Sequence, residues 1–267
     1  MNRCFNAARA LVCASAILLG GSAVAQTSGP IKNVVLVHGA FADGSSWSKV
    51  IPLLQEKGLH VTAVSNPLTS FADDVAATRR AIAAQDGPVI LVGHSYGGVV
   101  ITEAGNDPKV AGLVYVAAYA PDVGQAIGGM GTEFPKPVGL SKLVPLAGGF
   151  LVLSPDGIET AFAQDLPKKE QSLLTAVQAQ TSGSIIGAKA TAAAWKSKPD
   201  WYIVSTNDRM IAPDHERSMA KQMKARTTEL ASSHVPMLSH PKEVARIILE
   251  AASNAGGHAP GAKAAAN

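Results

Sequence analysis

The residues best suited to covalent chemistry lie in one pentapeptide, GHSYG at positions 93–97, which has the form G-x-S-x-G. An apolar, β-branched run at 88–92 precedes it and predicts a buried strand, and residues 98–104 predict a helix. A serine between a strand and a helix lies on a sharp, strained turn that exposes its hydroxyl. The context predicts that Ser95 is a nucleophile; the alternative is a turn built from small residues.

A serine nucleophile needs a base and a third group that orients the base. His234 follows the last predicted strand, in a loop at the carboxyl edge of the sheet, where ligands of open α/β sheets bind. Asp208 follows the strand predicted at 201–205, and the chain order Ser, Asp, His fits this arrangement. Asp214 is the alternative acid, although it is better placed in the first turn of the next helix.

Acyl transfer at a serine also requires donors for the oxyanion. The first expected donor is the backbone N–H of Tyr96, the residue after the serine. The second is expected after the first strand, where Gly39 permits a tight turn that directs the N–H of Ala40 at the site. Phe41 would then form a wall of the substrate pocket.

Strand-like and helix-like segments alternate along the chain, which predicts an α/β fold with a mostly parallel sheet and helices on both faces. The predicted strands comprise residues 31–37, 60–64, 88–92, 110–117, 201–205 and 227–231. The predicted helices include residues 47–57, 71–84, 98–104 and 241–252. Ser70 and Asp73 resemble a capping box, so we interpret Asp73 and Asp74 as helix-start charges rather than catalytic acids.

Residues 122–198 interrupt this alternation. They contain several Gly and Pro breakers and two short helix-like segments, at 157–164 and 168–180, but no convincing strand. An insertion of this size predicts a small helical cap over the active site, with a purely decorative insertion as the alternative. Apolar cap residues are expected to shape specificity, for example Met130, Leu146 and Phe150.

The first 25 residues resemble a cleavable signal peptide. They contain Arg3 and Arg9, an apolar stretch and an Ala-x-Ala site, so cleavage is expected before Gln26. The apolar stretch is short for a membrane span, so we expect a periplasmic or secreted protein without stable membrane insertion after cleavage. An uncleaved anchor is the alternative. Residues 26–253 are expected to form the catalytic domain, and residues 254–267 a disordered tail.

Cleavage would remove both cysteines, Cys4 and Cys13, leaving 242 of the 267 residues without a disulfide or thiolate. Of the 23 Lys and Arg, 21 would remain against 20 acidic residues. This near balance argues against a nucleic-acid partner. The chain has no H-E-x-x-H pattern or phosphate-binding loop, and the mature chain would have no cysteine pair, so neither a metal nor a cofactor is expected. The sequence makes no prediction of oligomeric state.

These patterns together resemble the α/β-hydrolase superfamily, in particular its small-esterase branch with plant methyl-ester hydrolases, hydroxynitrile lyases and bacterial homologues. The resemblance spans residues 31 to about 252, and the matching positions are His38-Gly39-Ala40, Gly44, Trp47, residues 93–98, Asp208 and His234-Val235-Pro236.

The resemblance implies a serine carboxylesterase that cleaves a small or medium apolar ester through an acyl-enzyme on Ser95, with His234 as base and Asp208 as acid. A small-molecule ester is the expected partner. Two alternatives stay open. The same triad could act on amides, lactones or hydroxynitriles, or the chain could be a non-catalytic binding module on a hydrolase scaffold.

Overall fold

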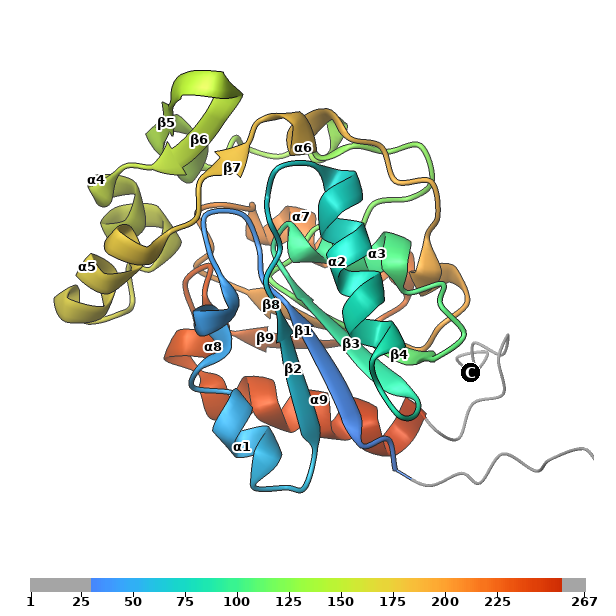
Figure 1. The fold of residues 1–267 in the computed structure, drawn as a ribbon. Helices are drawn as coiled ribbons and strands as arrows, with labels where there is room; N and C mark the ends of the chain where they lie inside the picture. The colour runs from blue at the N-terminus through green and yellow to red at the C-terminus, as the bar shows by residue number, and fades with distance from the viewer. Residues whose placement is uncertain (1–29, 256–267) are drawn as a thin grey trace, which may run out of the picture.

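A six-stranded parallel sheet lies at the centre of the computed structural model, which describes residues 30–255 (Figure 1). The strand order is β2-β1-β3-β4-β8-β9. The strands are β1 (Asn33–Val37), β2 (His60–Val64), β3 (Val89–His94), β4 (Val110–Val116), β8 (Asp200–Ser205) and β9 (Arg226–Leu230). All six predicted strands are present, and the predicted α/β fold is confirmed. The predicted signal peptide lies outside the described residues, as do residues 256–267 of the predicted tail.

Helices cover both faces of this sheet. One face packs against a 3₁₀ turn, η1, and three helices, namely η1 (Gly44–Trp47), α1 (Ile51–Gln55), α8 (Pro236–Ser239) and α9 (Pro241–Asn254). The other face packs against α2 (Phe71–Ala83), α3 (Gly97–Ala104) and α7 (Pro213–Met223). The helix predicted at 47–57 is wrong in its bounds, because η1 and α1 are separate elements. Helix α9 ends two residues later than predicted. No helix within residues 30–255 is long and apolar enough to span a membrane.

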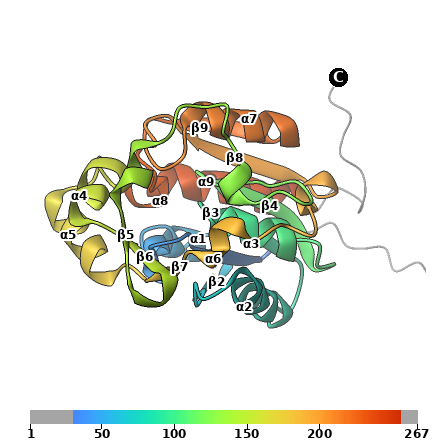
Figure 2. The same ribbon diagram turned by 90° about the horizontal axis from the view of Figure 1, so that it is seen from above.

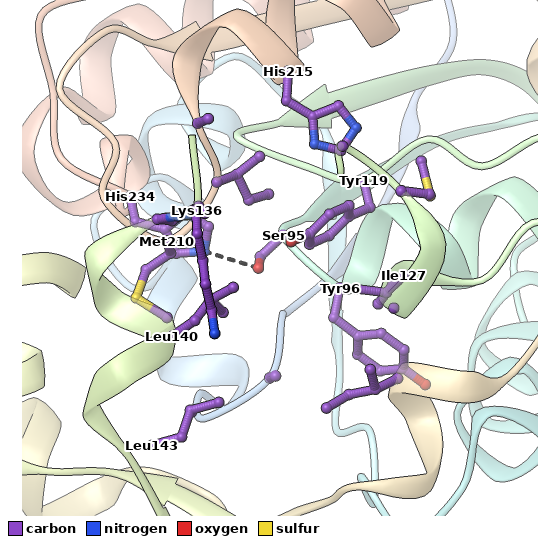
Figure 3. A pocket seen from close by; sticks show the side chains of 18 of the residues that line it. Ser95, Tyr96, Tyr119, Ile127, Lys136, Leu140, Leu143, Met210, His215 and His234 are labelled. Atoms are coloured by element: carbon purple, nitrogen blue, oxygen red, sulfur yellow. Dashed lines mark hydrogen bonds between the residues drawn. The ribbon is translucent and has the colours of Figure 1, made fainter. Parts of the chain in front are cut away.

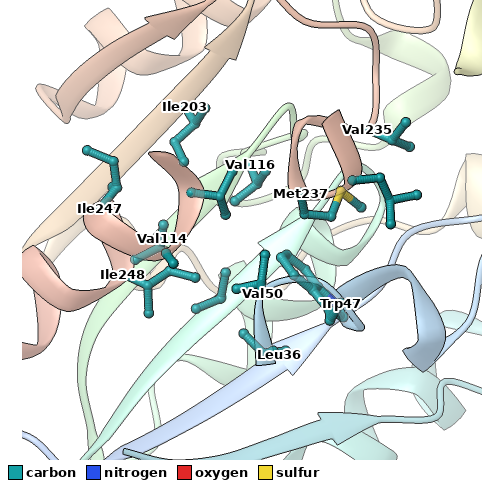
Figure 4. Packing of buried hydrophobic residues seen from close by; sticks show 14 of the residues in the cluster. Leu36, Trp47, Val50, Val114, Val116, Ile203, Val235, Met237, Ile247 and Ile248 are labelled. Atoms are coloured by element: carbon teal, nitrogen blue, oxygen red, sulfur yellow. The ribbon is translucent and has the colours of Figure 1, made fainter. Parts of the chain in front are cut away.

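The sheet is buried on both faces, as its apolar strands predict. Every residue of β1, β3 and β8 is buried. On one face, Leu36, Val114 and Ile203 pack with Trp47 of η1 and Ile248 of α9 (Figure 4). This burial holds the strands rigidly, so that the loops at their carboxyl ends have defined positions.

The insertion between β4 and β8 contains a small sheet, so the prediction of a cap without strands is wrong. Its antiparallel strands are ordered β5-β6-β7 and comprise β5 (Leu143–Pro145), β6 (Phe150–Leu153) and β7 (Thr181–Ser182). Gly148 and Gly149 adopt φ values of 72° and 78° in the turn between β5 and β6. The two glycines therefore form the turn of a β-hairpin and do not end the regular structure. Strands of two to four residues are too short to show a periodic pattern.

Short helical segments form the rest of the insertion. They are α4 (Pro155–Gly157), the π-helical turn η5 (Ile158–Phe162), α5 (Lys168–Val177), α6 (Ser184–Gly187), and the 3₁₀ turns η2 (Ile127–Gly129), η3 (Val138–Lys142), η4 (Ala147–Gly149) and η6 (Ala194–Lys196). In Figure 1, α4, α5, α6 and the small sheet β5–β7 lie beyond the carboxyl ends of the strands of the main sheet. Seen from above in Figure 2, α4 and α5 extend to one side, whereas α6 and β7 lie over the sheet. We call residues 122–198 the cap.

Candidate active site

Ser95 lies on the turn between β3 and α3 and has a φ of 52°, in the left-handed region that non-glycine residues seldom adopt. Small neighbours make this turn possible. A Cβ on Gly93 would lie 2.6 Å from the carbonyl oxygen of Gly97, and one on Gly39 would lie 2.7 Å from the Ser95 Cβ. The Ser95 N–H donates to Val116 of β4 at 3.2 Å. The strained turn is therefore held by the sheet itself.

Three side chains that are far apart in the sequence form one hydrogen-bonded chain. The distance from Ser95 Oγ to His234 Nε2 is 2.8 Å (Figure 3). The distance from His234 Nδ1 to Asp208 Oδ2 is 2.5 Å. A carboxylate oxygen only accepts, so Nδ1 carries the proton and Nε2 is free to accept from the serine. All three residues are buried. The structure thus brings together the predicted nucleophile, base and acid.

Asp208 is fixed from both of its oxygens. Oδ1 accepts the backbone N–H groups of Met210 at 2.6 Å and Ile211 at 2.9 Å, while Oδ2 faces the histidine. The alternative acid, Asp214, lies in the first turn of α7, where its exposed carboxylate pairs with Arg217 at 2.8 Å. The structure does not bring Asp214 to the hydrogen-bonded chain of Ser95.

His94, the residue before the serine, holds the backbone of the histidine that faces Ser95. Its Nε2–H donates to the carbonyl oxygen of His234 at 2.8 Å, and the two rings lie 4.8 Å apart. Burial is the main cause that lowers the pKa of His94 well below its ordinary value, so the ring stays neutral. The sequence did not indicate this contact.

The two expected oxyanion donors line the same cavity as Ser95. Neither the N–H of Ala40 nor that of Tyr96 donates to another residue within the described range 30–255. Phe41 also lines the cavity; it has a φ of 60°, and its N–H donates to Thr181 Oγ1 of the cap at 3.0 Å. Two backbone donors without a protein acceptor beside the serine hydroxyl are suited to binding an oxyanion.

The interpretation of Asp74 as a simple helix-start charge is incomplete. It does lie in the first turn of α2, but it is fully buried there. Its carboxylate accepts the Tyr96 hydroxyl at 2.7 Å and the N–H of Leu68 at 2.8 Å. Burial raises the pKa of Asp74, although these hydrogen bonds oppose that shift. Asp74 therefore anchors the side chain of the residue that follows Ser95. As predicted, Ser70 caps α2: its side chain accepts the N–H of the exposed Asp73, and its hydroxyl donates to the Asp73 carboxylate.

A second buried acid, Glu216 of α7, lies near Asp208. One of its oxygens accepts the N–H of Ser205 at 3.1 Å, and the other has no partner among the described residues. Burial, followed by the negative charge of Asp208, raises the pKa of Glu216 well above its usual value. Both causes favour the protonated form of Glu216 over its charged form. The sequence offered no signal for this arrangement beyond an acidic residue at a helix start.

Two consecutive cap residues contact the loops that carry Asp208 and His234. Gln164 donates to the carbonyl oxygen of Asn207 at 2.7 Å, and Asp165 accepts the N–H of Ser233 at 2.7 Å. Asn207 and Ser233 immediately precede the acid and the histidine. The cap therefore braces the Asp–His pair as well as covering it.

The cavity beside Ser95 has a volume of about 570 Å³ and is mostly apolar. The cap contributes Met130 to its lining, as expected, but neither Leu146 nor Phe150. Leu143 of β5 and Leu151 of β6 line it instead. Phe150 and Leu151 are consecutive in β6, and side chains alternate between the two faces of a strand, so only one of the two reaches the cavity. Within residues 30–255, no group of three or more His, Cys, Asp or Glu side chains is arranged to hold a metal ion.

The parallel sheet, the strand–serine–helix turn and a cap inserted after β4 define an α/β-hydrolase fold. Residues 34–247 match the model of the alpha/beta hydrolase family. The chain belongs to this family, as the sequence resemblance indicated, and it is an enzyme of the esterase kind found there.

Named relatives agree over most of their length. The alpha/beta hydrolase nvfD of Aspergillus novofumigatus is 26% identical over 83% of this chain and 97% of its own. Methylesterase 2 of Arabidopsis thaliana is 25% identical over 84% and 97%. Among solved structures, a pyrethroid hydrolase from Sphingobium faniae JZ-2 has a TM-score of 0.73 at 22% identity, covering 84% of this chain and 98% of that one. At that identity, the structural likeness shows the fold alone.

Proposed function

We propose that this protein is a serine carboxylesterase that cleaves small or medium apolar carboxylic esters through an acyl-enzyme on Ser95. The observation that carries the proposal is the buried hydrogen-bonded chain from Ser95 through His234 to Asp208, at the wall of a mostly apolar cavity. Named esterases among the relatives support the same class of reaction.

In the proposed mechanism, Ser95 Oγ attacks the ester carbonyl carbon while His234 Nε2 takes the hydroxyl proton. The carbonyl oxygen becomes an oxyanion and accepts the N–H groups of Ala40 and Tyr96. The C–O bond to the alcohol then breaks, and His234 returns the proton to the departing oxygen. Water, deprotonated by His234, attacks the acyl-enzyme, which releases the acid and restores Ser95. Asp208 keeps the proton on Nδ1 and stabilises the imidazolium.

The test compares wild-type protein with Ser95→Ala on 4-nitrophenyl esters of increasing acyl length. We expect kcat to fall on the order of 10⁶-fold with unchanged melting, as in other triad enzymes. A fluorophosphonate probe should label wild type but not the variant, which separates an enzyme from a binding module. Hydrolysis retained by a folded Ser95→Ala protein would refute the assignment. Activity confined to amides, lactones or hydroxynitriles would favour the alternative that the same three residues act on one of those substrate classes instead of on esters.

We also propose that the protein is exported and cleaved before Gln26. The supporting observation is the basic, apolar and Ala-x-Ala order of the first 25 residues. N-terminal sequencing of protein from the periplasm or medium should find Gln26 first. A membrane-bound form that begins with Met1 would contradict the proposal.

A further inference from the structure

Two aromatic residues form one wall of the Ser95 cavity and have no role in the mechanism above. Tyr119 follows β4, and its N–H donates to the carbonyl oxygen of Ser95 at 3.2 Å, which places it next to the nucleophile. His215 lies in the first turn of α7, with its ring centroid 5.9 Å from that of Tyr119 in an edge-on arrangement. Both residues line the cavity. In Figure 3 the Tyr119 ring extends toward Ser95, and the His215 ring lies above it, farther from Ser95.

The polar atoms of both side chains have no partner among residues 30–255. Neither the Tyr119 hydroxyl nor a ring nitrogen of His215 is hydrogen-bonded to any residue in the described part of the chain. Enclosed polar groups are nearly always hydrogen-bonded, so an unpaired hydroxyl that lines a cavity points to a ligand atom or water as its partner. Burial raises the pKa of Tyr119, so the hydroxyl keeps its proton and is available as a donor.

The cap holds this wall in a fixed shape. Phe134 stacks on His215 with ring centroids 5.3 Å apart and an interplanar angle of 18°. Gly131 has a φ of 69°, and a Cβ there would lie 2.3 Å from His215 Nδ1, so the cap backbone rests directly on the imidazole. A hydroxyl on a rigid wall recognises a substrate atom at low entropic cost.

The position of His234 decides which part of an ester would lie here. The leaving alcohol oxygen receives its proton from His234 Nε2, so the alcohol portion lies on the His234 side of Ser95. Figure 3 shows His234, Met210 and Leu140 on one side of Ser95 and Tyr119 on the other. The wall of Tyr119 and His215 therefore borders the acyl portion.

Building on the proposed esterase function, we infer that the Tyr119 hydroxyl is a specificity-determining donor that binds an oxygen atom in the acyl chain of the substrate. The favoured substrates are thus esters of oxo-, hydroxy- or alkoxy-substituted acids rather than of plain alkanoic acids. The rest of the acyl chain packs on the apolar lining.

The test uses two matched substrates, 4-nitrophenyl pentanoate and 4-nitrophenyl 4-oxopentanoate, with wild type and Tyr119→Phe. The readout is the ratio of kcat/KM for the oxo ester to that for the plain ester, which cancels differences in enzyme concentration and in folding. We expect Tyr119→Phe to lower this ratio about tenfold, the usual effect of losing one neutral hydrogen bond. Tyr115→Phe is the matched control, because it removes the same atom in the core, outside the cavity, where Tyr115 pairs with Thr102. It should leave the ratio unchanged.

An unchanged ratio in Tyr119→Phe would overturn the inference. If the ratio is unchanged because kcat/KM falls equally on both esters, the hydroxyl acts at the reacting atoms or in the structure alone. A Ser95→Ala protein assayed in parallel separates this inference from the proposed function. If Ser95→Ala still cleaves both esters, the esterase assignment fails; if only the ratio fails to respond, the assignment stands without this donor.

Discussion

Replacing Asp208 with asparagine tests the orientation of the proposed base more sharply than removal of the serine, because it changes one atom of the carboxyl group. The amide of the Asp208→Asn variant could in principle place either its oxygen or its NH₂ group toward His234. The backbone decides between them. The N–H groups of Met210 and Ile211, at 2.6 and 2.9 Å, both donate to Oδ1, so this position requires an acceptor.

Turning the amide around would break both of these buried hydrogen bonds, at a cost of about 1–3 kcal/mol each. The side-chain NH₂ therefore faces His234 Nδ1. A donor there forces the proton of the neutral imidazole onto Nε2, which then donates to Ser95 Oγ instead of accepting from it. The tautomer that takes the serine proton becomes rare. We expect kcat to fall on the order of 10⁴-fold, or about 5.5 kcal/mol of barrier.

The assay is steady-state hydrolysis of a 4-nitrophenyl ester, with melting followed by circular dichroism to confirm folding. Asp214→Asn is the matched control, because the Asp214 carboxylate is exposed and pairs with Arg217 on the surface. It should change kcat less than about threefold, since exposed ion pairs contribute little. A folded Asp208→Asn protein with kcat within about tenfold of wild type, or a larger loss in Asp214→Asn, would refute the reasoning.

Three further predictions concern the surroundings of the hydrogen-bonded chain. Glu216→Gln should stabilise the protein against unfolding more at pH 7 than at pH 4.5. Because the folded-state pKa of Glu216 is raised, wild type loses up to about 1.4 kcal/mol of stability per pH unit above the unfolded-state pKa, whereas the Gln variant does not. Urea unfolding at both pH values checks this, and a stability difference between the two proteins that is independent of pH would contradict it. Asp165→Ala should lower kcat about tenfold with little change in KM, because the Ser233 N–H loses its acceptor. Asp165→Asn keeps an acceptor oxygen and should retain most of kcat, so equal losses in the two variants would show that the acceptor does not matter. Met130→Ala should change the ratio of kcat/KM between short and long esters, whereas Ile247→Ala, on the buried face of α9, should lower the free energy of unfolding by about 3 kcal/mol. The opposite pattern would show that the cap does not determine specificity.

Much of the fold was predictable because its signals are local. The strands are apolar and continuous where the sheet is buried on both faces, so β1 and β3 are recognisable without their neighbours. The Ser95 turn is recognisable from its glycines, which are needed because neighbouring backbone atoms lie too close to leave room for a Cβ. Asp208 and His234 were predictable for a different reason: each follows a strand, and parallel strands bring their carboxyl ends to one edge of the sheet.

The cap sheet could not be predicted from such signals. Strands β5 and β6 are three and four residues long, and they are stabilised by pairing with one another across the Gly148–Gly149 turn. A pattern of alternating faces needs more residues than these strands contain. Consequently, Leu143 and Leu151 were not distinguished from Leu146 and Phe150, and the choice of pocket residues was partly wrong.

The sequence by itself determined the sheet, the turn that carries Ser95 and the order of the residues proposed to act with it. Only the tertiary structure decided which polar groups support them. Asp74 contacts Tyr96 across 22 residues, and Asp165 contacts Ser233 across 68. A polar residue in a helix start or a loop has the same sequence appearance whether it faces solvent or a buried partner. Its role depends on desolvation and on the hydrogen bonds it finds there, and both arise only when distant segments pack together.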